Sequence, residues 1–484
     1  MKKKLLPALI VTGLIILVVI IMGITALINK YTPTKKTEDL KEYFNISSDD
    51  EAALIVDNEL SDYKAKIIDK KIYVDYKFVH DSLNSRFYWD ANENVLLYTT
   101  ASDIISAAAD SNSYSVTKQT NDFGYPIVKA TSDSALIALD YVKQYSNITF
   151  KSYDDPARIV ITSKWDEIDS ATVSKSTQVR VKGGIKSPIL KEVKKDDKIT
   201  ILDSGDKWDK IATEDGVIGY IKRKALSESK KTKLTNPDYE EETFTHIKKD
   251  KDICLAWNQV TSQSANSKVP QVISSTKGIN VMSPTWFYLN DNNGNLADIA
   301  SKDYVSYCHS QGIEVWGLFS NFENTDVDAA YVLTHTSTRT TLINQIMSAA
   351  FNYELDGVNI DFENITEAAY GDSYIEFIRE LAIKCHNNGI SLSVDVTVPA
   401  SFNKFFNRSD MANFADYIVI MGYDEHYKGS DAGSVSSIPW VTEGVESTLK
   451  EVPADQIILG MPFYTRIWEL TPKEDDDAVT DTED

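Results

Sequence analysis

The chain has 484 residues, of which 42% are hydrophobic and 25% are charged. This length predicts about three domains, and the composition is that of an ordinary globular protein with enough apolar residues for a large core. Its 50 basic and 72 acidic residues give a net charge of −22, which argues against nucleic acid as a partner. We interpret the acidity as favouring solubility outside the cell, although surface composition alone explains it equally well.

The chain begins with three lysines after Met1, followed by an uncharged run from Leu5 to Ile28. These 24 residues can span a bilayer as a helix. A cleaved signal peptide has a shorter apolar core and a small-residue cleavage site, so we expect residues 1–30 to be a retained membrane anchor that spans at residues 5–28. The lysines predict a single-pass protein of the cell membrane with a cytoplasmic N-terminus and an extracellular remainder.

Residues 31–44 are a predicted polar linker, and residues 45–165 are predicted to form an α+β domain with an internal repeat. In this repeat, Val79, Asn84, Phe87, Leu96 and Thr99 match Val142, Asn147, Phe150, Ile159 and Thr162 at an offset of 63 residues. Each copy is typical of a helix, a turn and a strand. The segment weakly resembles the small N-terminal stalk domain of copper amine oxidases, without its copper ligands. Chance matching of two αβ units is the alternative.

Residues 171–226 contain short strand patterns separated by turns, which predict a small all-β barrel. The predicted strands are Gln178–Val181, Lys198–Leu202, Trp208–Ile211 and Gly216–Ile221. Their order resembles a bacterial Src-homology-3-like domain, a module that often accompanies cell-wall hydrolases. A spacer barrel without a ligand is the alternative. Residues 227–243, rich in Lys, Ser and Glu, are a second predicted linker.

Strand patterns alternate with helical segments over residues 244–484, which predicts an α/β domain. Seven strands are expected, at Ile253–Trp257, Ile279–Ser283, Ile313–Phe319, Gly357–Glu363, Ile390–Val396, Tyr417–Tyr423 and Ile457–Phe463. With helices between them, such as Tyr374–Asn388 ending at Gly389, they fit a (β/α)8 TIM barrel that lacks one strand. An open doubly wound sheet would require a glycine-rich turn after the first strand, and residues 257–260 contain none.

The fourth predicted strand carries the most informative pattern of the chain. In Asp356-Gly357-Val358-Asn359-Ile360-Asp361-Phe362-Glu363, polar and apolar residues alternate from Asn359 onward. A strand directs Asn359, Asp361 and Glu363 to one face, with successive side chains about 6 to 7 Å apart. We expect these acids to line the carboxyl end of a barrel strand. An amphipathic strand of an antiparallel sheet, with its acids in water, is the alternative.

Three motifs in chain order resemble glycoside hydrolase family 18. The segment from Asp356 to Glu363 resembles its D-G-x-D-x-D-x-E signature, Met421-Gly422-Tyr423-Asp424 matches M-x-Y-D, and the segment from Gly460 to Arg466 resembles G-x-P-x-Y-x-R. Within this family, Trp286 and the stretch from Pro462 to Trp468 look most like the branch of bacterial spore-cortex and cell-wall N-acetylglucosaminidases. The resemblance covers about half of the chain.

This resemblance implies a substrate-assisted retaining mechanism, in which the 2-acetamido oxygen of the substrate is the nucleophile. It implies that Glu363 is the general acid, that Asp361 orients the acetamide and that Tyr423 donates a hydrogen bond to the acetamide oxygen. The substrate-binding residues that it implies are Asn359, Met421, Asp424, Tyr464, Arg466 and Trp286; for the last four, core packing or a surface ion pair is the alternative.

The chain departs from the family pattern at two places. Asn359 occupies a position where most members have an aspartate, so we expect it to hydrogen-bond Asp361 without being able to take up its proton. After Trp468 the sequence is acidic and gives no pattern for an eighth strand, so we expect the barrel to be incomplete and the sequence to be part of a longer protein.

Neither a metal nor a cofactor is predicted. The six histidines are scattered, and the three cysteines, Cys254, Cys308 and Cys385, show no CxxC spacing. At most one disulfide could form from three cysteines, so we expect buried free thiols.

The resemblance and the predicted anchor together imply an extracellular glycosidase that cleaves β-1,4 bonds next to N-acetylglucosamine in peptidoglycan. Chitin is the alternative substrate, because no residue reports on the lactyl group of muramic acid. A non-catalytic glycan-binding protein of the cell surface is the alternative of a different class. Retention of Glu363 argues against it, whereas Asn359 and the missing strand argue for it.

Overall fold

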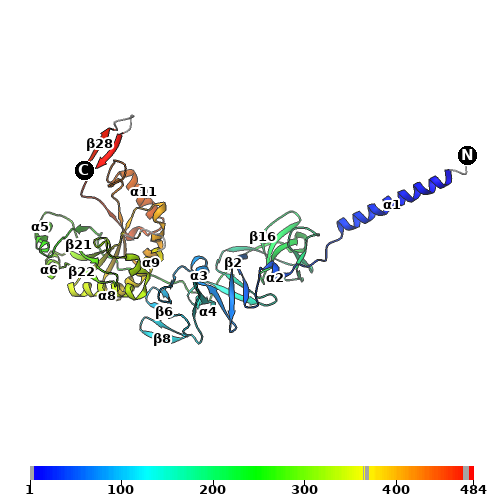
Figure 1. The fold of residues 1–484 in the computed structure, drawn as a ribbon, viewed down its shortest axis with the longest axis horizontal. Coiled ribbons are helices and arrows are strands. Elements are labelled where there is room, and N and C mark those ends of the chain that lie inside the picture. The colour runs from blue at the N-terminus through cyan, green and yellow to red at the C-terminus, as the bar shows by residue number, and fades with distance from the viewer. Residues whose placement is uncertain (1–4, 364, 366–369, 473–478, 484) are drawn as a thin grey trace. The chain divides into compact units, whose positions relative to one another are not determined.

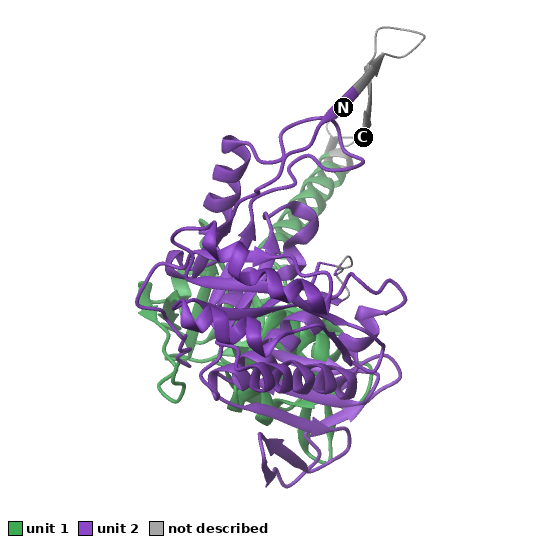
Figure 2. Cartoon of the chain, turned by 90° about the vertical axis from the view of Figure 1, so that its left-hand side faces the viewer, with its two compact units in different colours: residues 1–84, 136–241 green, residues 85–135, 242–484 purple. Residues whose placement is uncertain are grey.

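The computed structural model describes residues 5–363, 365, 370–472 and 479–483. The chain divides into two compact units, the first made of residues 1–84 and 136–241 and the second of residues 85–135 and 242–484 (Figure 2). The segment predicted as one α+β domain, residues 45–165, is therefore divided between the units, because residues 85–135 belong with the C-terminal half. Its unity as a domain stays a prediction.

The first unit begins with the helix α1 (Leu5–Tyr31) (Figure 1). The stretch Leu9–Tyr31 has a mean hydropathy of 2.9 and is not buried at all. Among the described residues it is the one helix that is long and apolar enough to cross a membrane, a property that membrane anchors and signal sequences share.

Two sheets make up the rest of the first unit. Within this unit the strands of the first sheet run in the order β11-β12-β1-β2-β3-β10, and the second sheet is antiparallel, in the order β15-β14-β18-β17-β16-β13-β19. The elements are α2 (Leu40–Tyr43), β1 (Glu51–Val56), β2 (Glu59–Ile68), β3 (Lys71–Asp75), α3 (Tyr76–Ser82), β10 (Ala135–Ala138), α4 (Leu139–Gln144), β11 (Thr149–Tyr153), β12 (Arg158–Thr162), β13 (Glu167–Thr172), β14 (Thr177–Arg180), β15 (Ile189–Val193), β16 (Lys198–Asp203), β17 (Trp208–Thr213), β18 (Ile218–Lys222) and β19 (Lys230–Lys233).

The two sheets of the first unit share one hydrophobic core. Phe44 and Ile55 from the N-terminal part lie in the same cluster as Val179, Ile211 and Ile221 from residues 171–226. The four strands predicted in that segment are present as β14, β16, β17 and β18. The resemblance of residues 171–226 to a Src-homology-3-like domain stays a prediction. The shared core shows that this segment packs against the N-terminal part of the unit instead of forming a separate domain core.

The second unit is built on a sheet of seven parallel strands, in the order β20-β21-β23-β24-β25-β26-β27. Each of the seven predicted strands is present, as β20 (Leu255–Asn258), β21 (Val281–Leu289), β23 (Glu314–Ser320), β24 (Gly357–Asp361), β25 (Ser391–Thr397), β26 (Tyr417–Met421) and β27 (Ile457–Gly460). The short β22 (Leu296–Asp298) pairs antiparallel with β21. In the described part of the chain no strand joins β27 to β20, so the sheet is a half-barrel.

Rings that meet across the inner face show that this sheet is curved. Trp316 on β23 and Tyr417 on β26 lie with ring centroids 5.6 Å apart, although two strands separate them. A Cβ on Gly460 of β27 would lie 2.9 Å from the ring of Trp257 on β20, so the first and last strands also approach each other. At Gly357 a Cβ would lie 2.6 Å from the Trp316 ring, which explains the glycine of the fourth strand.

Helices cover the outer face of the sheet (Figure 1). They are α5 (Val269–Ser274), α6 (Lys302–Ser310), α7 (Ala329–Thr334), α8 (Thr336–Tyr353), α9 (Gly371–His386), α10 (Arg408–Phe414) and α11 (Ile438–Thr448). The helix predicted at Tyr374–Asn388 is α9, and Gly389 after it has a φ of 69°, as a glycine that ends a helix commonly does. A hairpin, β28 (Trp468–Pro472) with β29 (Val479–Glu483), follows β27.

Residues 85–135 form an antiparallel sheet that packs on α8 and α9 of the half-barrel. Its strands are β4 (Phe87–Asp90), β5 (Val95–Thr99), β6 (Ile104–Ala108), β7 (Ser113–Val116) and β8 (Gln119–Asp122), and β9 (Val128–Ala130) follows. Thr99 donates a hydrogen bond of 2.8 Å to the fully buried Glu376, and the hydroxyls of Tyr88 and Ser373 lie 2.9 Å apart. These contacts bury polar residues of α9 that would otherwise face solvent.

The cysteines require one correction. All three are free, and Cys308 and Cys385 are buried as expected. Cys254 is exposed, because it precedes β20 instead of lying within it.

Candidate active site

Strand β24 carries the acids to the inner face of the sheet. Its apolar residues Val358 and Ile360, followed by Phe362, are buried in the core between the sheet and the helices. Because side chains alternate along a strand, Asn359 and Asp361 point to the opposite, inner face. Glu363 follows two residues after the end of β24, at the carboxyl edge of the parallel sheet.

Asn359 is the centre of a hydrogen-bond network below the acids. Its Oδ1 accepts from the indole N–H of Trp257 at 2.9 Å and from the hydroxyl of Ser283 at 3.0 Å. Its Nδ2 donates to Oδ1 of Asp395 at 2.7 Å. The expected hydrogen bond from Asn359 to Asp361 is replaced by this one to Asp395, because the amide N–H faces the neighbouring strand β25.

Asp361 is 9% exposed, and its carboxyl favours the neutral form. Burial raises its pKa to about 8, with further contributions from the carboxylates of Glu363 and Glu323. Its Oδ1 is buried without a hydrogen-bond partner in the part of the chain that the structure describes. The last residue of β24 is therefore an acid that can hold a proton at neutral pH.

Glu363 is exposed at the carboxyl edge of the sheet. Partial burial of its carboxyl raises its pKa, and the negative charges of Asp424 and Glu323 raise it further. Glu323 lies in the segment after β23, and both of its carboxylate oxygens lie 2.6 Å from the hydroxyl of Ser320. Glu363 can consequently present a proton towards solvent or a bound ligand.

Asp395 on β25 is an acid of this site that the sequence motifs did not identify. It is 2% exposed, and burial together with the charge of Asp361 raises its pKa well above the ordinary value for a carboxyl. The alternation Ser391, Ser393, Asp395 repeats the pattern of the fourth strand and could have indicated it. Buried acids on two neighbouring strands thus share the inner face.

Tyr423 lies at the same edge, just after β26. Its ring makes edge-to-face contacts with Trp257 and Tyr464, at centroid distances of 6.2 Å in both cases. Burial raises the pKa of its phenol, as do the charges of Asp395 and Asp361, so its hydroxyl stays protonated and available as a donor.

Asp424 connects the end of β26 to the segment after β27. It adopts a left-handed backbone conformation, with φ at 61°. Its Oδ1 accepts hydrogen bonds of 2.7 Å from the hydroxyl of Tyr464 and from Nη2 of Arg466. Met421, the last residue of β26, is 7% exposed below this cluster. The structure thus brings together four predicted site residues that follow β26 and β27, namely Tyr423, Asp424, Tyr464 and Arg466, and the charge of Asp424 acts on Glu363.

Trp286 is the predicted site residue that the structure does not bring to this face. It is fully buried in the core between the sheet and the helices, and its indole N–H donates to Asn266 at 2.8 Å. Its ring packs edge-to-face on Tyr304, 4.9 Å away. On β21, Ser283 faces inward, and the third residue after it must face outward. Trp286 therefore stabilises the outer core instead of lining the site.

No three His, Cys, Asp or Glu side chains of the described residues are grouped as a metal site. The chemistry that the inner face offers is proton transfer between carboxyls of raised pKa and hydrogen bonding by a neutral phenol.

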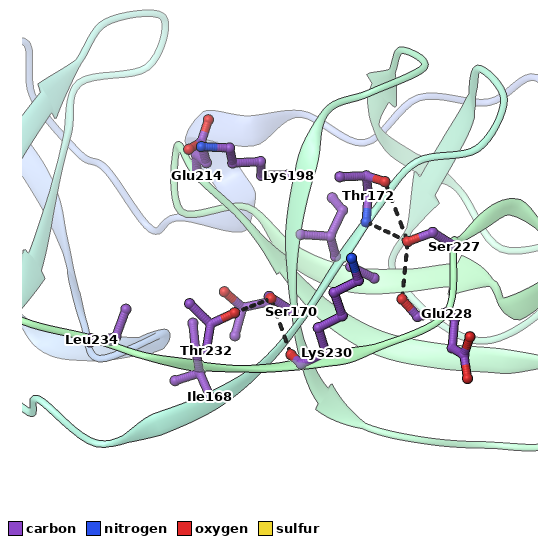
Figure 3. A pocket seen from close by; sticks show the side chains of 13 residues that line it. Ile168, Ser170, Thr172, Lys198, Glu214, Ser227, Glu228, Lys230, Thr232 and Leu234 are labelled. Carbon is purple, nitrogen blue, oxygen red and sulfur yellow. Dashed lines mark hydrogen bonds between the residues drawn. The ribbon is translucent and has the colours of Figure 1, made fainter.

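The first unit contains a pocket of about 550 Å³ beside strands β13 and β19 (Figure 3). Ser170 and Thr232, which line it, hydrogen-bond each other at 2.6 Å, and Ser227 accepts from the backbone N–H of Thr172 at 3.0 Å. Four of its hydroxyls, those of Ser170, Thr172, Ser227 and Thr232, hydrogen-bond within the protein, and its charged lining consists of exposed lysines and glutamates. This pocket lacks the buried titratable groups of the inner face.

A segment of the second unit is similar to known proteins. The family model of Glycosyl hydrolases family 18 matches residues 316–484, a range that contains Asp361, Glu363 and Asp395. An uncharacterised glycosylase, YvbX, of Bacillus subtilis is 25% identical over 194 residues, which cover 37% of this chain and 55% of that protein. The cortical fragment-lytic enzyme of Bacillus subtilis is 26% identical over 187 residues, which cover 37% of this chain and 43% of that protein.

Among solved structures, a chitinase from Chromobacterium violaceum is similar at 21% identity and a TM-score of 0.39, covering 43% of this chain and 68% of that one. The chain spans about half, or less, of the length of the two curated relatives described above.

The raised pKa of Asp361 predicts a pH-dependent effect of the substitution Asp361→Asn on stability. An aspartate in the unfolded chain ionises near its ordinary value, whereas the folded protein holds this proton to about pH 8. The stability that the neutral carboxyl contributes is therefore complete in acid and is lost as pH rises between these two values. Asparagine mimics the neutral acid, so the D361N variant should gain stability relative to the parent as pH increases.

Urea denaturation at pH 4.5, 6, 7 and 8.5 measures this difference. The exposed Asp326 provides the control, because D326N should show no such increase across the same range. A stability difference between D361N and the parent that stays constant with pH would show that Asp361 is ionised throughout.

Proposed function

We propose that the chain is a glycosidase of the family whose model matches residues 316–484, and that it cleaves a β-1,4 bond next to N-acetylglucosamine by a retaining, substrate-assisted mechanism. The observation that carries this proposal is the placement of Asp361 and Glu363, two acids of raised pKa, at the carboxyl end of one parallel strand. Catalytic groups of barrel enzymes are found at this end of the strands.

Glu363 is the general acid of the proposed reaction. Its raised pKa keeps a population of the neutral carboxyl near neutral pH, and its exposure at the edge of the sheet lets it reach a leaving group. The proton passes from Glu363 to the glycosidic oxygen as the bond from that oxygen to the anomeric carbon breaks. The acetamido oxygen of the same sugar then bonds to the anomeric carbon, which gives an oxazolinium ion and a Glu363 carboxylate.

Asp361 and Tyr423 position the acetamide in this proposal. An ionised Asp361 accepts a hydrogen bond from the acetamide N–H and balances the positive charge of the oxazolinium. The phenol of Tyr423, which remains protonated, donates to the acetamide oxygen. In the second half of the reaction the Glu363 carboxylate removes a proton from water, the water oxygen bonds to the anomeric carbon, and the acetamide is released with retention of configuration.

The remaining residues of the cluster bind the sugar in this proposal. Asp424 receives hydrogen bonds from Tyr464 and Arg466, so the cluster presents oriented polar groups and an aromatic ring beside Glu363. Met421 contributes an apolar surface, and Asn359 holds the network under the acids. Such a combination of aromatic surface and fixed polar groups is typical of carbohydrate sites.

Peptidoglycan is the proposed substrate, because the cortical fragment-lytic enzyme is among the similar proteins and the chain begins with an apolar helix. We propose that residues 5–28 anchor the protein in the cell membrane and that the catalytic part lies outside the cell. The Src-homology-3-like segment of residues 171–226 would then hold the enzyme near the cell wall. Chitin is the alternative substrate, because no residue of the chain reports on the lactyl group that distinguishes muramic acid.

A non-catalytic glycan-binding role is the second candidate function. The observation that favours it is Asn359, which cannot exchange a proton with Asp361 and donates instead to Asp395. This role requires the site to bind sugar without turnover.

The substitution Glu363→Gln should abolish hydrolysis while sugar binding remains, because glutamine keeps the size of the side chain and cannot donate a proton to the leaving group. Release of reducing ends from purified peptidoglycan measures hydrolysis, and sedimentation of the protein with the same insoluble glycan measures binding. We expect a loss of at least about 100-fold in rate for E363Q. The exposed Glu446 of α11 provides the control, and E446Q should retain the parent rate.

Equal rates in E363Q and the parent would remove Glu363 from the role of general acid. Sugar binding by a parent protein that releases no reducing ends from either polymer would favour the non-catalytic role.

Mass spectrometry of the released fragments distinguishes the two candidate substrates. From peptidoglycan we expect disaccharide-containing fragments with N-acetylglucosamine at the new reducing end. Cleavage of chitin oligomers together with an absence of fragments from peptidoglycan would overturn the choice of peptidoglycan and leave the glycosidase proposal in place.

A further inference from the structure

We propose that Asp395 shares one proton with Asp361, so that Asp395 is the acid–base partner that Asn359 cannot be. This inference rests on the proposed function for its catalytic meaning, but the proton sharing itself is a property of the free protein. Asp395 is a positioning residue in this scheme, because it acts on the substrate through Asp361.

The register of the sheet places the two carboxyls at the same level. On the neighbouring parallel strands β24 and β25, Asn359 pairs with Ser393 and Ile360 pairs with Val394. The next residue of each strand is Asp361 and Asp395, respectively. Strands in a sheet lie about 4.8 Å apart, and residues at one level of parallel strands point to the same face. The two side chains therefore lie next to each other on the inner face.

Each of the two carboxyls has one buried oxygen that lacks a partner. These oxygens, Oδ1 of Asp361 and Oδ2 of Asp395, receive no hydrogen bond from any described residue. Two carboxylates cannot donate to each other, and burying both charges side by side is costly. A single proton between the two side chains removes one charge and gives both oxygens a partner, as in acid pairs that share a proton.

Asn359 fixes the arrangement from the other side. Because Trp257 and Ser283 both donate to its Oδ1, its amide N–H must point to Asp395. Oδ1 of Asp395 is thus engaged as an acceptor, which leaves Oδ2 as the oxygen that can carry the proton. In this chain Asn359 supplies the amide and Asp395 supplies the acid. The family signature instead has an aspartate at the position of Asn359.

The groups around the pair favour one shared proton over none. Glu363 on the same chain segment and Glu323 after β23 add negative charge. The phenols of Tyr374 on α9 and Tyr423 after β26 stay neutral, because burial and the charges of Asp395 and Asp361 raise the pKa of both. The hydrogen bonds that the Asn359 amide and the Trp257 indole offer to Asp395 act in the opposite direction and lower its pKa.

The shared proton gives Asp361 a way to ionise inside a buried site. When an acetamide N–H approaches, the O–H bond on Asp361 breaks and an O–H bond forms on Oδ2 of Asp395. The pair keeps a net charge of −1, and Asp361 becomes the anion that the oxazolinium requires. No proton has to leave for solvent, and the reverse transfer restores the resting state when the acetamide departs.

Carbon-13 NMR titration of aspartate carboxyls in the full chain, solubilised in detergent micelles, tests the pairing without a substrate. The Asp361 signal is assigned by its loss in D361N. In D395N the amide at position 395 removes the second acid at nearly constant shape, so the proton affinity of Asp361 should fall at least about tenfold. In the double variant N359D/D395N, which moves the acid to position 359, we expect the affinity to return towards that of the parent.

The substitution Ser391→Ala is the matched control, because Ser391 is buried on the same strand and faces the same side as Asp395. It should leave the Asp361 titration unchanged. An Asp361 titration in D395N that equals that of the parent would overturn the proposal, since the high pKa would then arise from burial, Glu363 and Glu323 alone. A fall in D395N that the double variant does not reverse would also overturn it, because the new amide itself would be the cause.

The two proposals can fail separately. Turnover in the parent that is lost in E363Q, combined with an unchanged Asp361 titration in D395N, would retain the glycosidase and remove the shared proton. A reversed titration in the double variant with no turnover in the parent would retain the shared proton and remove the glycosidase.

Discussion

The alternation of side chains along β24 is the constraint on which the rest of the site depends. Burial of Val358 and Ile360 between the sheet and its helices fixes the orientation of the strand, since a shift of one residue would expose these side chains and bury the acids in the outer core. The same constraint holds Asp361 on the inner face of the curved sheet, where it is 9% exposed. A carboxyl placed there titrates far from its ordinary range.

Burial also explains why two acids of the site can differ in their roles. Glu363 follows the strand and is exposed, so in the proposed reaction its proton reaches the leaving group, whereas the enclosed Asp361 exchanges its proton with a neighbour in the proposed pair. The network of Trp257, Asn359 and Asp395 supplies that neighbour from a different strand. In the proposed pair, an acid beside Asp361 is required, and it can come from the neighbouring strand β25 instead of from position 359 of the signature.

The periodic parts of the molecule could be predicted from the sequence, and the contacts between distant segments could not. All seven strands of the half-barrel follow from hydrophobic patterns, because burial on the outer face imposes the pattern directly. The packing of residues 85–135 on α9 has no local signature, since it depends on hydrogen bonds such as that of Thr99 with Glu376. Asp395 follows the alternation of its strand and could have been found. The prediction that Trp286 binds substrate is wrong, because an aromatic residue near a predicted strand end is typical both of a sugar site and of a core, and this one lies in the core.

Participation of the acetamide is the central claim, and hydrolysis of paired substrates tests it most directly. The measurement compares cleavage of a β-1,4-linked N-acetylglucosamine oligomer with cleavage of the same oligomer after removal of its acetyl groups. The account predicts that the parent protein cleaves the acetylated oligomer with retention of configuration and leaves the free amine intact, because an amine has no carbonyl oxygen to attack the anomeric carbon. Cleavage of both oligomers at similar rates, or inversion at the anomeric carbon, would contradict it.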